Sequence, residues 1–83
     1  MKQYLICAFY PNGKPVYSLS KSRNAMMHIN AKGARSIEVY DKDGWLLSRA
    51  ERNAAGIAYR PRLFLDGEPR NIYKRIYEEL RNG

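Results

Sequence analysis

The sequence has little of what most metal centres and disulfide-stabilised folds are built from. It contains one cysteine, Cys7, and one histidine, His28. A single cysteine excludes an internal disulfide framework and a zinc site made of cysteine ligands. Cys7 lies in the apolar run 5–9, where we expect it to be a small buried hydrophobe. We therefore predict neither a metal nor another cofactor for this chain.

Recognisable catalytic motifs are also missing. There is no Gly-x-x-x-x-Gly-Lys phosphate loop and no Gly-x-Ser-x-Gly nucleophile elbow. Residues 41–44 resemble the start of a calcium loop, but the glycine comes two positions early and the twelfth residue is an arginine, so we interpret them as a turn. We predict that the protein is not an enzyme. One enzymatic alternative stays open, a small basic ribonuclease that uses His28, Tyr59, Arg60 and Arg62.

Long apolar runs are absent as well. No segment approaches the roughly 18 apolar residues that a membrane-spanning helix needs. Lys2 precedes a short apolar run, but no small-residue cleavage site follows, so we expect an N-terminal strand and not a signal peptide. This pattern and the single thiol favour a cytoplasmic protein that does not contact membranes.

Acidic residues are missing from the first 35 positions, which carry six bases. Residues 36–48 have a net charge of −2, residues 49–62 have +3, and residues 63–83 are balanced, giving +7 for the chain. Two separated basic blocks indicate an anionic partner, nucleic acid first. The alternative is that the excess charge serves solubility alone.

The clearest structural pattern is a hairpin over residues 36–47. Ile37 and Val39 alternate with polar residues as in a half-buried strand, and residues 41–44 have the composition of a tight turn.

The pattern of the whole chain predicts one α+β domain over residues 1–83, in the order ββαββ(loop)α. We expect a four-stranded, mostly antiparallel sheet with helices covering one face. The expected elements are strands over 3–10 and 16–19, a helix over 22–32 that ends at Gly33, strands over 36–40 and 45–47, and an irregular stretch over 51–65 with a brief strand at 57–59. A final helix opens at 66–69, where Asp66 or Glu68 can cap it or favour its dipole.

The final helix has an apolar stripe at helical spacing, which predicts packing against the sheet. Its members are Ile72, Tyr73, Ile76, Tyr77 and Leu80. We expect a monomer, and the two tyrosines leave a dimer seam as the alternative.

Basic and aromatic residues define the predicted binding surface. On the first helix, Lys21, Asn24, His28 and Lys32 follow one another at spacings of three and four and predict a polar ridge. Tyr59 beside two arginines is typical of a site that grips phosphates while an aromatic ring stacks on a base. The alternatives are an ordinary solvated helix edge, and a loop in which Tyr59 and residues 63–65 cover the end of the sheet. The predicted binding residues are Lys21, His28, Lys32, Arg35, Arg49, Arg52, Tyr59, Arg60 and Arg62.

These features favour a non-catalytic binding module whose partner is DNA or RNA, or the nucleic-acid-binding groove of a larger assembly. The order of elements differs from those of the RNA-recognition, KH and double-stranded-RNA domains, so binding is expected to depend on backbone charge. The alternative is a stoichiometric inhibitor with a basic face that meets an acidic protein surface of a nucleoprotein complex. Short basic proteins of phages and mobile elements, anti-CRISPR proteins among them, are often of that kind.

Overall fold

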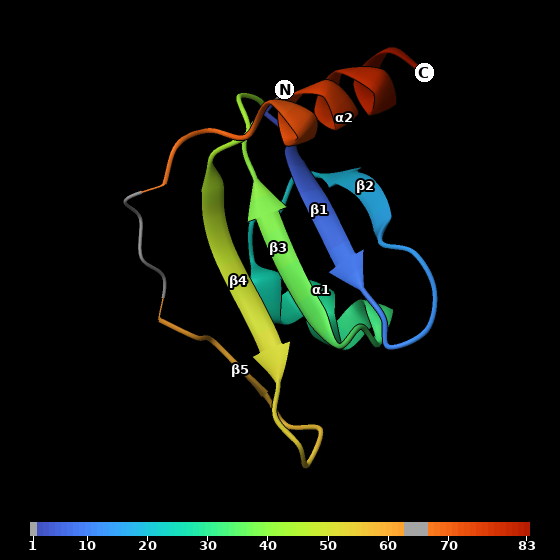
Figure 1. Ribbon diagram of the computed structural model, residues 1–83, viewed down its shortest axis with the longest axis vertical. Helices are drawn as coiled ribbons and strands as arrows, with labels where there is room; N and C mark the ends of the chain where they lie inside the picture. Colours follow the sequence, from blue (N-terminus) through green and yellow to red (C-terminus); the bar gives the residue numbers. More distant parts are fainter. Residues whose placement is uncertain (1, 63–66) are drawn as a thin grey trace.

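The computed structural model describes residues 2–62 and 67–83 and shows a small α+β fold (Figure 1). The class predicted from the sequence is confirmed, with one strand more than expected. In chain order the elements are β1 (Tyr4–Phe9), β2 (Val16–Ser20), α1 (Ala25–Lys32), β3 (Ser36–Tyr40), β4 (Leu46–Arg52), β5 (Ala58–Tyr59) and α2 (Asn71–Asn82).

The strands form a single antiparallel sheet in the order β2-β1-β3-β4-β5. The additional strand, β5, pairs with the end of β4 because residues 53–56 make a tight turn. The Asn53 side chain accepts hydrogen bonds from the backbone N–H groups of Ala55 (2.9 Å) and Ile57 (3.0 Å), and Gly56 has a φ of +82°. The brief strand predicted at 57–59 is therefore confirmed, and β4 extends to Arg52, five residues beyond the predicted end of that strand.

β1 is apolar on both of its faces, and this feature sets the layers of the fold. Tyr4, Ile6 and Ala8 contribute to a core on one side of the sheet, together with Ile29 of α1. The alternate residues of β1, among them Leu5 and Cys7, form a second core on the other side with Tyr77 of α2. Since side chains alternate along a strand, a central strand with no polar position needs cover on both sides.

The two helices accordingly lie on opposite faces of the sheet (Figure 1). The prediction that both helices cover one face is wrong. It assumed one polar face of the sheet, whereas β1 has none. On α2, Tyr77 is buried and Tyr73 stacks on Tyr40 with 3.9 Å between ring centroids. Ile72 and Leu80, predicted to pack with them, are 59% and 40% exposed.

The ends of the helices follow local capping chemistry. Asn24 is the N-cap of α1, and its Oδ1 accepts a hydrogen bond from the N–H of Met27 at 3.2 Å. Gly33 ends α1 in the left-handed conformation, as predicted. α1 starts three residues later than predicted because the hydroxyl groups of Ser20 and Ser22 accept hydrogen bonds within the preceding loop.

α2 begins at Asn71 with no side-chain cap, so the predicted cap at Glu68 is wrong. The alternative cap, Asp66, and the predicted cover at 63–65 lie outside the described residues. Neither helix, within the part of the chain described, is long and apolar enough to span a membrane.

The β3–β4 turn is confirmed at residues 41–44 and ties the sheet to α2. Asp41 Oδ1 accepts hydrogen bonds from the backbone N–H groups of Asp43 (2.9 Å) and Trp45 (3.0 Å), and Gly44 has a φ of +90°. The N–H of Arg70, at the entrance to α2, donates to the carbonyl of Gly44 at 3.0 Å. A Cβ atom at position 44 would lie 2.3 Å from the carbonyl oxygen of Arg70, so only glycine fits this approach.

We expect Gly44→Ala to lower the free energy of unfolding by about 2–4 kcal/mol, because it adds a backbone clash to an unfavourable φ. Gly56→Ala is the matched control, since Gly56 also has a positive φ but faces open space; we expect a loss of about 1–2 kcal/mol there. Urea unfolding followed by circular dichroism measures both. Equal losses in the two variants would show that the contact between residues 44 and 70 does not constrain the fold.

Two buried ionisable groups, Cys7 and Tyr40, make the free energy of unfolding depend on pH in the alkaline range. Burial, and secondarily the charge of Glu38, raises the pKa of the Cys7 thiol to about 12 from its ordinary 9.0. Burial likewise raises the pKa of the Tyr40 hydroxyl. The folded state holds these protons more tightly than the unfolded chain does, so the stability they contribute is complete below the unfolded pKa and is lost as the pH rises toward the folded one.

We therefore expect the midpoint of urea unfolding to fall as the pH rises above about 9. Cys7→Ala removes one of the responsible groups, so its midpoint, although lower at pH 7 because a cavity is left, should fall less steeply between about pH 9 and 11. If the urea midpoints of the parent protein and of Cys7→Ala fall equally steeply with pH, the role assigned to the buried thiol is contradicted.

Candidate functional site

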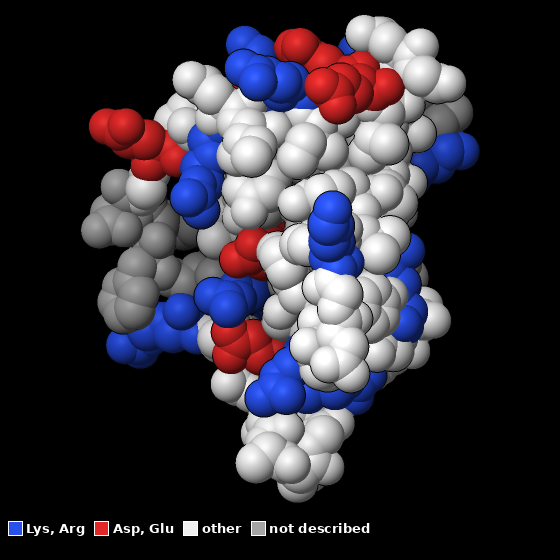
Figure 2. Space-filling model, turned by 45° about the vertical axis from the view of Figure 1, so that its right-hand side comes forward, with Lys and Arg blue, Asp and Glu red and all other residues white. Residues whose placement is uncertain are grey.

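Ion pairing within the described residues involves a single basic side chain. Arg49 Nε lies 3.8 Å from Glu38 Oε2, and an Nη atom of Arg49 contacts Glu51 Oε1. Tyr40 donates to Glu38 at 3.1 Å and Tyr59 donates to Glu51 at 2.9 Å, which completes a row across β3, β4 and β5. Figure 2 shows acidic and basic side chains alternating along this face of the sheet. Arg49 and Tyr59, both predicted binding residues, are thus held by neighbouring carboxylates, and the hydrogen bond to Glu51 raises the pKa of Tyr59.

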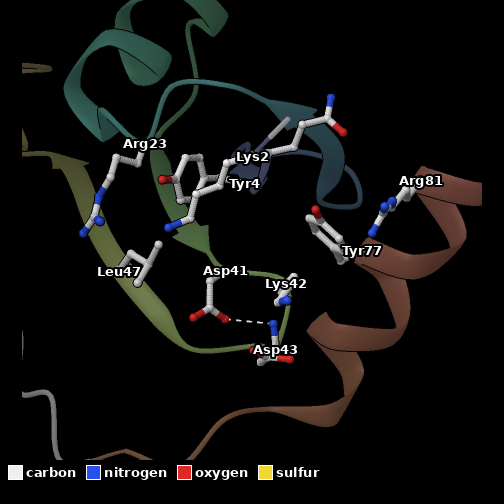
Figure 3. Close-up of a pocket in the computed structure, with 10 residues that line it drawn as sticks. Lys2, Tyr4, Arg23, Asp41, Lys42, Asp43, Leu47, Tyr77 and Arg81 are labelled. Carbon is white, nitrogen blue, oxygen red and sulfur yellow. Dashed lines mark hydrogen bonds between the residues drawn. The ribbon is translucent and has the colours of Figure 1, made fainter.

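Other basic side chains line a groove at the end of the sheet where β1 begins and β3 ends (Figure 3). The groove encloses a cavity of about 500 Å³. Four cations line it, each from a different part of the chain: the start of β1, the loop before α1, the β3–β4 turn and the end of α2. They are Lys2, Arg23, Lys42 and Arg81.

The groove is lined by side chains from both cores. Tyr4 and Leu47 belong to the core under α1, and Tyr77 belongs to the core under α2. Leu47 joins the α1 side because the pairing of β3 with β4 shifts at Val39/Tyr40, a bulge that leaves Leu47 without a partner. Lys2 Nζ and the Arg23 guanidinium each lie 5.9 Å from the centre of the Tyr4 ring, a distance at which cations are attracted to aromatic faces.

A second cavity, of about 400 Å³, adjoins the groove because both are lined by Arg23 and Leu47. Arg60 lines it, and its guanidinium donates to Asn24 Oδ1 at 3.2 Å. Ser48 donates to the carbonyl of Arg23 at 2.8 Å, which fixes the loop that carries Arg23. Basic side chains therefore line two adjoining cavities that extend from the end of α2 to the start of α1.

The nine predicted binding residues do not form one surface. Arg60 lies at the groove, and Lys21 lies at the same end of the sheet without lining the cavity. Arg35 lines a different hollow at the opposite end, beside Pro11 and Gly33, and Lys32 is the last residue of α1 at that end. Arg62 is exposed.

Two of the predicted residues serve the fold. The predicted exposed ridge on α1 is wrong for His28, which is 6% exposed and has Nε2 2.9 Å from the carbonyl oxygen of Ser22. The guanidinium of Arg52 donates to three backbone carbonyls, those of Ala34 (2.9 Å), Gly56 (3.0 Å) and Ile29 (3.1 Å). Arg52 thereby joins the end of α1 to the β4–β5 turn.

The residues of the ribonuclease alternative, His28, Tyr59, Arg60 and Arg62, do not lie together in one site either. Tyr59 faces the α2 side of the sheet beside Glu51, whereas Arg60 reaches the start of α1 on the other side. His28 is a buried residue of α1. Among residues 2–62 and 67–83, no group of three or more His, Cys, Asp or Glu side chains could hold a metal ion.

The predicted binding residues include none of the four cations that line the groove, Lys2, Arg23, Lys42 and Arg81. They lie in different segments, and Lys42 and Arg81 belong to the segments of balanced or negative charge. Only the folding of α2 across the face opposite α1 brings the end of that helix to the β3–β4 turn.

Comparison with known proteins gave no match, either to a protein-family model, to a curated protein or to a solved structure.

Proposed function

We propose that this protein binds nucleic acid through its phosphate backbone, in the basic groove at the end of the sheet. The observation that carries this proposal is that cations from separate segments line the groove and its adjoining cavity without an ion-pair partner among the described residues. They are Lys2, Arg23, Lys42, Arg60 and Arg81. Asp41 and Asp43 also line the groove, but the four cations that line it outnumber them, so the lining carries a net positive charge that attracts a polyanion.

The aromatic residues of the groove are too buried to stack on a base, which favours recognition of the nucleic acid by its charge. Tyr4 and Tyr77 are both buried, and cations lie over the Tyr4 ring. Neither ring offers an open face on which a base can stack, so the binding energy has to come from phosphate contacts. We expect the affinity to depend strongly on salt.

The alternative, inhibition of a nucleoprotein complex through an acidic protein surface, would use the same cations against carboxylates. The two functions differ in what they predict for isolated nucleic acid. A protein inhibitor binds one partner with fixed stoichiometry and has little affinity for random DNA or RNA.

Fluorescence anisotropy with labelled single-stranded and duplex DNA and RNA, at salt concentrations from about 50 to 200 mM, tests the proposal. If all five cations contact phosphates of a single strand, log K should fall with log [salt] with a slope of about −3.5. Arg23→Gln combined with Arg81→Gln should weaken binding about tenfold and bring the slope to about −2.

The matched control is Lys14→Gln combined with Arg35→Gln, which removes the same charge outside the groove, in the β1–β2 loop and at the start of β3. This control should stay within about threefold of the parent, the difference that long-range charge alone makes. Equal losses in the two double variants would mean that net charge and not the groove holds the nucleic acid. Binding that disappears at physiological salt would favour the protein partner.

A further inference from the structure

One acidic side chain in the groove is held in a fixed position. Asp41 Oδ1 accepts the two backbone hydrogen bonds that close the β3–β4 turn, from Asp43 and Trp45. Figure 3 shows the other carboxylate oxygen on the side of Asp41 that faces away from Asp43, toward β4, and Asp41 lines the cavity together with Leu47 and Lys2. The turn therefore presents one carboxylate oxygen to the cavity at a constant place.

The charge of this carboxylate is not neutralised by the cations around it. Lys2 and Arg23 line the same cavity, yet within the described residues the ion pairs are those of Arg49 alone. A phosphate placed next to Asp41 would be repelled. A ligand that fits the whole groove therefore carries negative charge near the cations and a hydrogen-bond donor near Asp41.

We infer that Asp41 reads the Watson–Crick edge of an unpaired base, and that the preferred base is guanine. Guanine presents two adjacent donors on this edge, N1–H and the N2 amino group, which together match a carboxylate. Thymine and uracil place their single N–H between two carbonyl acceptors that the carboxylate would repel. In a duplex these edges are already paired, so the inference specifies single strands.

The size of the site agrees with a single nucleotide. The cavity of about 500 Å³ lies in the range of small-ligand sites, about 300–1,000 Å³. A base placed there would keep its own phosphate near Lys2 and Arg23 and the next one toward Arg60 along the adjoining cavity. This inference rests on the proposed function, and it adds base selectivity to binding that otherwise depends on charge.

The test compares labelled oligothymidines of about 12 residues that carry one central G, A, C or T, together with the RNA and duplex forms. The parent protein should bind the G-containing single strand about tenfold more tightly than the all-T strand. Asp41→Asn should abolish this preference and bind the all-T strand at least as tightly as the parent does. Asparagine keeps the oxygen that closes the turn, so the fold is retained.

Asp43→Asn is the matched control, because it removes the same charge from a side chain two residues away that lines the same cavity. It should keep the preference for G. Equal affinity of the parent protein for all four strands would overturn the inference and leave the proposed function intact, whereas no salt-dependent binding to any strand would overturn the proposed function itself. Displacement of the G-containing strand by free guanosine monophosphate at equal concentration would assign the site to a mononucleotide and also overturn the inference.

Discussion

The arrangement of this protein depends on β1, an interior strand whose side chains are apolar on both faces of the sheet. Leu5, Ile6 and Cys7 are fully buried, and neighbours in this run point to opposite sides of the sheet. A strand of this kind is stable only between two covering layers, since burying its apolar surface is the main favourable contribution to folding. α1 supplies one layer and α2 supplies the other, and the loop before α1 and the last turn of α2 both reach the end of the sheet where β1 begins.

The basic groove lies between these two segments. The loop into α1 brings Arg23 to one rim, the last turn of α2 brings Arg81 to the other, and the β3–β4 turn lies between them. The turn is closed by Asp41 and tied to α2 through the contact of Gly44 with Arg70. The contacts that hold the turn and α2 in place therefore also fix the positions of the cations. The ion-pair row of Arg49 lies apart from this groove, on the face that carries α2.

Local patterns were sufficient to predict most elements of the fold and insufficient to predict the site. The alternation at Ile37 and Val39, the turn at 41–44 and the glycine that ends α1 each depend on residues close in sequence, and all three are confirmed. The placement of α2 depends on both faces of β1 at once, which a helical stripe alone does not reveal. The predicted surface failed at His28 and Arg52 for a related reason: their partners are backbone carbonyls from segments that the sequence does not show to be neighbours.

The most direct test of the groove is a map of amide chemical shifts in ¹⁵N-labelled protein titrated with a short single-stranded oligonucleotide. We expect the shifts to concentrate at residues 2–4, 22–24, 41–43, 60 and 77–82, the segments that line the groove and the hollows beside it. Residues 35 and 52–56, at the opposite end of the sheet, should remain unchanged. Shifts centred on those residues, or on the Arg49 row, would contradict the assignment of the groove as the binding site.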